Sequence, residues 1–414
     1  MHIFLKNRAF RQLTVNEWIS SFGDTIFYLA FINYVSSYAF APLAIFLISL
    51  SETIPQVLQL FTGVIADFQK NRISKYISIL FIKVLLYSGV TLLLTSTDFS
   101  LFSVFFICSM NLISDTIGFL AGYMLTPIYI RLINDDMTEA MGFRQSTSSI
   151  VRLIGNLSGG VFLGLFSIST LAFVNVLTFL FAFLGSLLIR NRLKKEEEKI
   201  EVPPYVGMSS FFQHLKESMK LLMTMEDVMV MVLLWILSIS QAVLMMVEPV
   251  SAILLIHHPF MGLSTGQSLA ILIMISLLHV ILGGLLSGFL SKKISIRLNI
   301  YWSLLMESLI VIDFLRGSFL LILLGSAGDA FSAGVLSPRL QAMIFGIIPE
   351  ELMGSVQSSI NVINLLIPAV LSLALVFLAT SAGLEVVAFA LIILLLIAAY
   401  LVHQMKNLPN QEEV

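Results

Sequence analysis

Charged residues are scarce in this sequence of 414 residues. Asp, Glu, Lys and Arg together make up 12% of it, whereas a soluble domain carries about 25%. Hydrophobic residues make up 58%, and the mean hydropathy is +0.97. A soluble chain with this composition would leave large apolar surfaces in water. The shortage of charge therefore excludes an ordinary soluble protein and indicates a chain that lies in a lipid bilayer.

Cysteine is nearly missing too, and the single Cys108 excludes an intramolecular disulfide bond and a metal site built from cysteines. The sequence has no glycine-rich phosphate loop ending in Lys-Ser/Thr, no His-Glu-x-x-His helix and no nucleophile elbow. Its net charge of −2 gives no basic field for nucleic acid. We therefore expect no enzymatic activity, no cofactor, no metal and no nucleic-acid partner. An ion gradient is then the expected energy source.

Long apolar runs are what the sequence has in abundance. A membrane-spanning helix needs about 20 mostly apolar residues, and these runs are too long and continuous for the strands of a membrane barrel. We predict an all-α membrane protein with twelve transmembrane helices. The expected spans are 12–36, 41–67, 73–96, 99–126, 142–167, 169–190, 228–256, 264–291, 295–315, 318–346, 351–379 and 383–404.

Lysine and arginine lie almost entirely on one side of these spans. They precede the first span, follow the last, and occupy the connections after spans 2, 4, 6 and 8, whereas the opposite side carries only Arg316. By the positive-inside rule both termini face the cytoplasm. The basic N-terminal segment has no small-residue cleavage site and is interpreted as a retained first span. We expect a multi-pass protein of the plasma membrane.

The halves of the chain resemble each other. Residues 191–227 break the apolar pattern and predict a cytoplasmic linker with an amphipathic helix on the membrane surface. The linker separates an N-terminal bundle, 1–190, from a C-terminal bundle, 228–414. Glu, Met, Gly, Gln and Ser match in register between the segments 139–146 and 351–358, which open spans 5 and 11. This register indicates two pseudo-symmetric six-helix bundles.

Two motifs resemble the major facilitator superfamily. The loop after span 2 matches the loop motif of that family at Gly63, Asp67 and Arg72, and departs from it at 68, 70 and 71. The resemblance implies a cytoplasmic gating loop. Span 5 resembles the glycine motif of the antiporters in the family, with Asn156 where proline is usual, and it implies helix packing and export. Its glycines are Gly155, Gly159 and Gly160.

Three further segments are similar to macrolide-efflux-type and siderophore-exporter-type carriers. They are Ser21-Phe-Gly23-Asp24, Phe173-Val-Asn175-x-x-Thr178-Phe179, and the Pro349–Ser358 segment before span 11. The resemblance covers essentially the whole chain. It implies the major facilitator fold, alternating access, proton exchange and a protein that functions as a monomer.

Charged side chains inside the spans point to an internal polar pathway. Each costs about 2.5–3.5 kcal/mol at a helix centre, so most must face a bundle interior, pair with one another or lie near a helix end. The candidates for proton coupling or the substrate cavity are Asp24, Glu17, Asp115, Arg152, Glu248, Glu307 and Asp329.

Several of these residues have more than one interpretation. Asp24 is either a proton carrier or a carboxylate that is bonded to a neighbouring helix for packing. Asp115 and Arg152 are expected as a buried ion pair, structural or gating. Lys83 is expected to extend toward the membrane surface.

Three other polar side chains in the spans have structural interpretations. Asp313 is expected to pair with Arg316, which lies three residues later on the same helix. Glu52 precedes Pro55, and its carboxylate is interpreted either as a buried acid or as a group that hydrates a proline kink.

The sequence as a whole predicts a secondary active transporter. Its expected partners are a small-molecule substrate, protons and the lipid bilayer, and the expected activity is proton-coupled efflux of small amphipathic, drug-like compounds. An importer or passive facilitator is the alternative. A sensor or complex subunit that transports nothing is a more distant one.

Overall fold

The computed structural model describes residues 2–35, 37–95, 99–133, 137–205, 207–224, 228–257, 260–263 and 265–404. Every regular element in these ranges is helical. Twelve helices in the described part have 21 residues or more and follow the predicted spans in order. They are α2 (Arg8–Val35), α3 (Ala41–Asp67), α4 (Arg72–Thr95), α5 (Leu101–Leu132), α6 (Met137–Leu165), α7 (Ile168–Glu197), α9 (Val228–His257), α10 (Thr265–Leu290), α11 (Ile296–Arg316), α12 (Leu320–Ile347), α13 (Met353–Ala382) and α14 (Leu384–Gln404).

Eight of these helices are long and apolar enough to cross a membrane over their described residues. The remaining four, α2, α3, α6 and α9, have comparable lengths of 27 to 30 residues. Three short elements complete the described chain: α1 (His2–Lys6), α8 (Met208–Thr224) and the 3-10 turn Glu350–Leu352.

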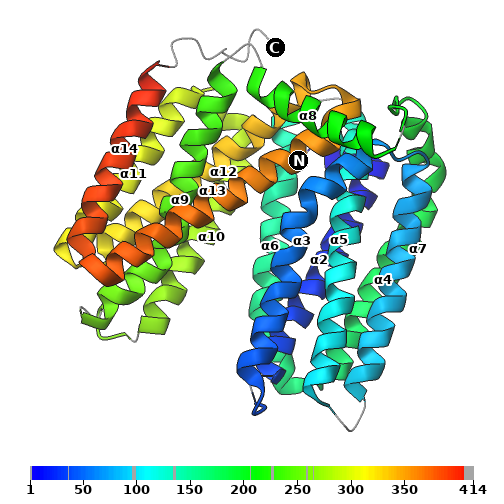
Figure 1. The fold of residues 1–414 in the computed structure, drawn as a ribbon, viewed down its shortest axis with the longest axis horizontal. Helices are drawn as coiled ribbons and strands as arrows, with labels where there is room; N and C mark the ends of the chain where they lie inside the picture. Colours follow the sequence, from blue (N-terminus) through cyan, green and yellow to red (C-terminus); the bar gives the residue numbers. More distant parts are fainter. Residues whose placement is uncertain are drawn as a thin grey trace. The chain divides into compact units, whose positions relative to one another are not determined.

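The chain forms two compact units, drawn in Figure 1. Unit 1 comprises Met1–Met137, Thr147–Met219 and Phe345–Val362, and unit 2 comprises Thr138–Ser146, Lys220–Ile344 and Ile363–Val414. Each unit therefore contains a short stretch from the other half of the sequence. The division at 190 and 228 stays a prediction.

Unit 1 is a bundle in which α3 packs on α5, and α7 packs on both α2 and α4. Its core gathers aromatic side chains, with Tyr87 edge-on to Phe27 at 5.5 Å and close to Phe179 at 5.2 Å between ring centroids. The close contact of α2 with α7 depends on Gly23, because a Cβ there would overlap Asn175 and Thr178 of α7. Two of the sequence motifs thus meet in space.

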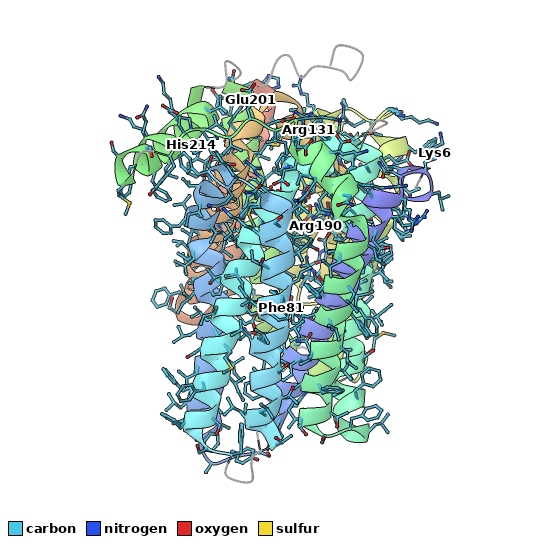
Figure 2. All side chains as sticks on the ribbon, turned by 90° about the vertical axis from the view of Figure 1, so that its right-hand side faces the viewer. Lys6, Phe81, Arg131, Arg190, Glu201 and His214 are labelled. Atoms are coloured by element: carbon cyan, nitrogen blue, oxygen red, sulfur yellow. The ribbon has the colours of Figure 1, made fainter. Side chains whose placement is uncertain are left out.

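Helix α8 lies across one end of unit 1 (Figure 1). Its Phe211 is buried and stacks on Phe61 of α3 at 6.2 Å, whereas the neighbouring Phe212 is exposed. Figure 2 shows Lys6, Arg131, Glu201 and His214 at this same end, which is the end predicted to be cytoplasmic.

Unit 2 has an aliphatic core formed mainly by α9, α11 and α14. The turn from α11 to α12 is held by Asp313, which is fully buried and accepts hydrogen bonds from the amides of Leu321 and Ile322 at 2.8 and 3.1 Å. The expected pair with Arg316 is therefore wrong. The first amides of a helix have no partner within it, and the carboxylate of Asp313 satisfies two of them at the start of α12, while Arg316 is exposed.

The matched segments of the two halves make matching contacts, each in its own unit. Gly142 at the start of α6 lies against Gly284 and Ser287 of α10 in unit 2. Gly354 at the start of α13 lies against Gly63 of α3 in unit 1. In both cases the missing side chain lets two helix backbones approach closely, which explains why glycine stands at both positions.

Candidate functional site

A cavity of about 250 Å³ lies inside unit 1 among α2, α3, α4, α5 and α6. Asp24, Glu52 and Asp115 bring three carboxyl groups to its wall, and Arg152 brings a guanidinium. Aromatic rings supply much of the remaining lining, from Phe27, Tyr28, Phe31 and Tyr87. Acidic groups and aromatic faces around one cavity suit an organic molecule that carries a positive charge.

Asp24 lies between two partners on other helices. Its Oδ1 accepts a hydrogen bond from Asn175 of α7 at 3.1 Å, and its Oδ2 lies 3.9 Å from Nζ of Lys83 on α4. The side chain of Asp24 keeps 32% of its surface exposed, compared with 9% for Lys83. The carboxylate therefore faces the cavity, while its counter-ion is enclosed by protein.

Lys83 points inward, so the expectation that it extends toward the membrane surface is wrong. Its ammonium group lies 4.8 Å from the centre of the Phe179 ring and also attracts the carboxylate of Asp115. Gly118 on α5 leaves room for it, because a Cβ there would come within 3.1 Å of Nζ. Two carboxylates and an aromatic face together outweigh the gain from reaching water.

Asn111 on α5 connects the other acidic groups. Its Nδ2 donates to Oε1 of Glu52 at 2.8 Å and to Oδ2 of Asp115 at 3.2 Å. Its Oδ1 accepts from the hydroxyl of Tyr87 at 2.8 Å. Neither Asn111 nor Tyr87 was predicted as a site residue, although an amide in the middle of an apolar span is itself a signal of interior polarity. Glu52 proves to be a cavity residue.

Asp115 and Arg152 line the same cavity without forming an ion pair with each other. Asp115 bonds to Asn111, and the side chain of Arg152 is exposed. The expected pair is therefore not formed in this structure.

Glu17 and Glu248 lie outside the residues that line this cavity. The carboxylate of Glu17 accepts a hydrogen bond from the hydroxyl of Tyr129 at 3.4 Å. Glu248 is exposed on α9, beside Pro249 inside that helix. The other two acidic candidates, Glu307 and Asp329, are buried in unit 2.

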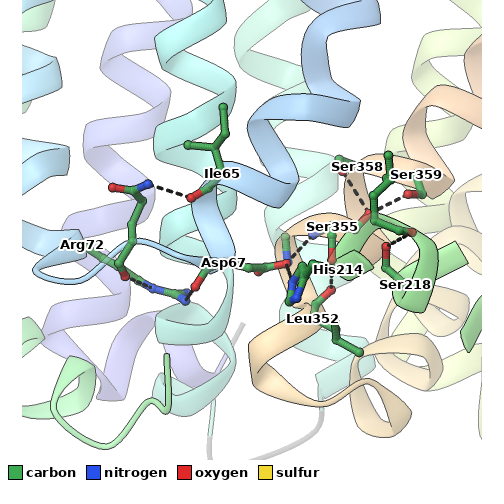
Figure 3. Close-up of polar contacts among 12 residues, drawn as sticks. Ile65, Asp67, Arg72, His214, Ser218, Leu352, Ser355, Ser358 and Ser359 are labelled. Carbon is green, nitrogen blue, oxygen red and sulfur yellow. Dashed lines mark hydrogen bonds and ion pairs between the residues drawn. The ribbon is translucent and has the colours of Figure 1, made fainter. Parts of the chain in front are cut away.

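Asp67, the carboxylate of the predicted gating loop, is fully buried at one end of unit 1 (Figure 3). It accepts hydrogen bonds from the backbone amides of Gly354 and Ser355, both at 2.8 Å, at the start of α13. Its Oδ2 also lies 3.1 Å from Nε2 of His214 on α8. One carboxylate thus holds the end of α3, the start of α13 and the linker helix together.

Gly63 and Arg72 support this arrangement. A Cβ on Gly63 would overlap the carbonyl of Gly354 and the side chain of Ser358, so glycine is required where α3 meets α13. Arg72 is buried, and its Nη2 donates to the carbonyl of Asp67 at 3.0 Å. The arginine therefore braces the backbone of the loop.

His214 was not singled out from the sequence, and it explains a departure from the family motif. Phe68 stands where that motif has a basic residue, and its ring packs on the imidazole of His214 at 4.7 Å. At this position of the motif, an aromatic side chain that contacts the linker helix α8 therefore stands in place of a charged side chain.

The glycines of the antiporter-like motif lie on α6. Gly155 faces α2, where a Cβ would lie 3.0 Å from two atoms of Thr25, so it allows close packing beside the cavity. Gly159 and Gly160 are helical, but their surroundings lie outside what the structure describes. In the described part of the chain, no group of three or more His, Cys, Asp and Glu side chains is placed to hold a metal ion.

No protein-family model matches this sequence, and no curated protein matches it. Solved structures match over nearly the whole chain. A bacterial homologue of the iron transporter ferroportin, in an outward-facing state, is 14% identical, with 96% of this chain and 99% of that chain covered and a TM-score of 0.69. The E. coli fucose:proton symporter is 12% identical, with 97% and 99% covered and a TM-score of 0.62.

A proton:xylose symporter of the major facilitator superfamily is 13% identical, with 96% of each chain covered and a TM-score of 0.55. Identities this low show the fold alone. The chain is an all-α membrane protein with the twelve-helix major facilitator fold, and that prediction is confirmed.

Proposed function

We propose that this protein is a secondary active transporter that exports small amphipathic compounds in exchange for protons. The observation that carries the proposal is the cavity of unit 1, where Asp24, Glu52 and Asp115 meet aromatic rings inside a membrane-embedded bundle. Such carboxylates are costly to keep in a membrane. Their position on a cavity wall supports a functional role, because a carboxylate there can bind a proton and a cationic substrate alternately.

The substrate class follows from the lining. A ring face attracts a positively charged group, and carboxylates favour the same charge. The volume of about 250 Å³ suits a compact organic molecule rather than a peptide. Amphipathic amines are therefore the first compounds to test.

The direction of transport is proposed from the antiporter-like glycines on α6. Import or passive facilitation is the alternative, and the fucose and xylose symporters share the fold. We place the protein in the plasma membrane with both termini cytoplasmic, on the basis of its one-sided lysines and arginines. We expect it to work as a monomer with an N-terminal bundle, a linker and a C-terminal bundle.

Purified protein in proteoliposomes with an imposed pH gradient tests the proposal directly. A panel of fluorescent amphipathic amines should accumulate against their own gradient, and a protonophore should abolish the accumulation. Asp24→Asn should reduce this uphill transport at least tenfold, because an amide cannot exchange a proton. The matched control is Glu217→Gln on the exposed face of α8, which should transport like the unmodified protein.

The alternatives predict other results. Counterflow that is indifferent to the pH gradient would indicate a passive facilitator, and accumulation driven in the same direction as proton entry would indicate an importer. Binding of a stable protein partner without transport of any compound would indicate a sensor or complex subunit. Unchanged uphill transport by Asp24→Asn would remove Asp24 from the mechanism.

A further inference from the structure

Unit 2 contains two carboxyl groups that the cavity of unit 1 does not use. Glu307 on α11 and Asp329 on α12 are 0% and 1% exposed. Close packing of the two helices brings them together, because Gly325 and Gly328 lie directly against Met306 and Ile310 of α11. The two carboxyl groups interact electrostatically across this contact.

Their oxygens have few partners. Oδ1 of Asp329 accepts a hydrogen bond from the hydroxyl of Ser303, one turn before Glu307 on α11. Oδ2 of Asp329 and both carboxyl oxygens of Glu307 are buried without a hydrogen bond. The hydroxyl of Ser326, one turn before Asp329, is also buried and unbonded. Three carboxyl oxygens thus lie in the interior of unit 2 without a hydrogen bond in the described part of the chain, and the group closest to supplying one to Glu307 is the hydroxyl of Ser240 on α9.

In the described part of unit 2, the neighbouring elements supply no counter-charge. From α9 the polar group that acts on Glu307 is the hydroxyl of Ser240, and from α11 the one that acts on Asp329 is Ser303. The side of α14 that is buried in unit 2 is apolar, with Val387, Leu391 and Leu395. Among the described residues, no lysine, arginine or histidine acts on either acid. This differs from the cavity, where Lys83 accompanies Asp24.

Charge balance then requires a bound cation. Moving one ionised carboxylate into a protein interior is unfavourable even after the surroundings relax, and two adjacent negative charges add their repulsion. A proton removes one of these charges and gives its carboxyl group a hydrogen to donate. A metal cation is a poorer fit, since hard cations take six or more oxygen ligands. Here two carboxyl groups and a few serine hydroxyls surround the site.

We propose that Glu307 and Asp329 form a proton-binding site in unit 2, separate from the substrate cavity, and that its proton couples transport to the pH gradient. The coupling role rests on the proposed function; the binding of a proton does not. Glu307, whose oxygens are all unbonded, holds the proton, and Asp329 is the acceptor that faces it. Ser303 is a positioning residue that orients Asp329.

Infrared difference spectroscopy of the full-length protein in lipid tests proton binding without any substrate. Spectra recorded between acidic and alkaline pH should show the carbonyl stretch of a protonated, buried carboxyl group, which exchange into D2O shifts. Glu307→Gln should remove that band, and Asp329→Asn should shift it. Glu385→Gln, an exposed acid at the start of α14, is the matched control and should leave it unchanged. A spectrum of Glu307→Gln identical to that of the unmodified protein would overturn the proposal.

Transport assays test the coupling role. With the amine panel, Glu307→Gln should reduce accumulation driven by the pH gradient at least tenfold, and Ser303→Ala should shift the pH at which transport is half-maximal. Uphill transport by Glu307→Gln at the normal rate would overturn the coupling role and leave the proposed function intact. A carboxyl band without transport of any compound would overturn the proposed function and leave the proton site intact. Accumulation driven by a sodium gradient alone would assign the site to sodium instead.

Discussion

At the scale of single residues, the acidic side chains inside the helical units differ in the partners that stabilise them. Asp24 has a cation and an amide as partners, and Asp313 has the free amides of a helix. Glu307 accepts no hydrogen bond of normal length from the residues that the structure describes, and the hydroxyl of Ser240 is the polar group that acts on it. A buried carboxylate without partners destabilises a fold. The partners of Asp24 and Asp313 explain why the fold tolerates these two acids, whereas the presence of Glu307 needs a different explanation.

Glu307→Met tests whether that reason is structural. Methionine has a similar shape and no polar atom. At alkaline pH, where the site has lost its proton and both acids are ionised, the free energy of unfolding of the variant should therefore be about 1–3 kcal/mol higher than that of the unmodified protein, the usual cost of an unsatisfied buried polar group. Asp313 is equally buried, but Asp313→Leu should lower the free energy of unfolding, because it leaves the amides of Leu321 and Ile322 without an acceptor. Thermal unfolding in detergent measures both. A lower midpoint for Glu307→Met would mean that this acid stabilises the fold.

Lys83→Met provides a second test at this scale. The variant removes the cation beside Asp24 and should lower the free energy of unfolding by about 1–3 kcal/mol, less than for a fully buried pair because Asp24 is partly exposed. Lys83→Met combined with Asp24→Asn should recover much of the loss, since no uncompensated charge remains. The double-mutant cycle measures this coupling energy. Independent, additive effects would show that the two groups do not interact.

At the scale of helices, local sequence patterns predicted the helices well, but they could not predict which side chains on different helices contact one another. Hydrophobicity is a property of each segment alone, so the spans and their order followed from the sequence. The inward turn of Lys83 depends on Asp24, Asp115 and Phe179, which stand on three other helices. The cap formed by Asp313 likewise depends on how α12 begins. Gly23 and Asn175 could be singled out, but only the packing of α2 on α7 shows that they meet.

The linker helix α8 yields a prediction of its own. His214→Ala removes one of the three groups that bond to the carboxylate of Asp67 and opens the contact with Phe68. Because the hydrogen bond and the ring packing are both lost, we expect α8 to detach more often. Amide hydrogen exchange in 208–219 should be at least several-fold faster, while that of α4 stays unchanged. Lys216→Ala, exposed on the same helix, is the control. Equal exchange in the two variants would show that His214 does not anchor α8.

At the scale of the whole molecule, the repeated glycine contacts concern the relation between the two matched segments, and the one-sided basic residues concern the orientation of the chain in the membrane. Gly142 and Gly354 stand at equivalent positions of the two matched segments and each face a glycine of another helix. Loops rich in Lys and Arg resist transfer across a membrane. The connection at 68–71 and the linker should therefore lie on the cytoplasmic side, and the turns at the opposite ends of the helices outside.

The single cysteine makes this orientation directly measurable. In a Cys108→Ala background, cysteines at Lys70 and Ser37 mark exposed positions beyond the opposite ends of α3. In right-side-out vesicles a membrane-impermeant maleimide should label Ser37→Cys and spare Lys70→Cys, and inside-out vesicles should give the reverse. Both should react after the membrane is dissolved, which controls for accessibility. Labelling of Lys70→Cys from outside would show that the predicted topology is inverted. The contacts of Asp67 with α13 and α8 would then lie on the outer side of the membrane.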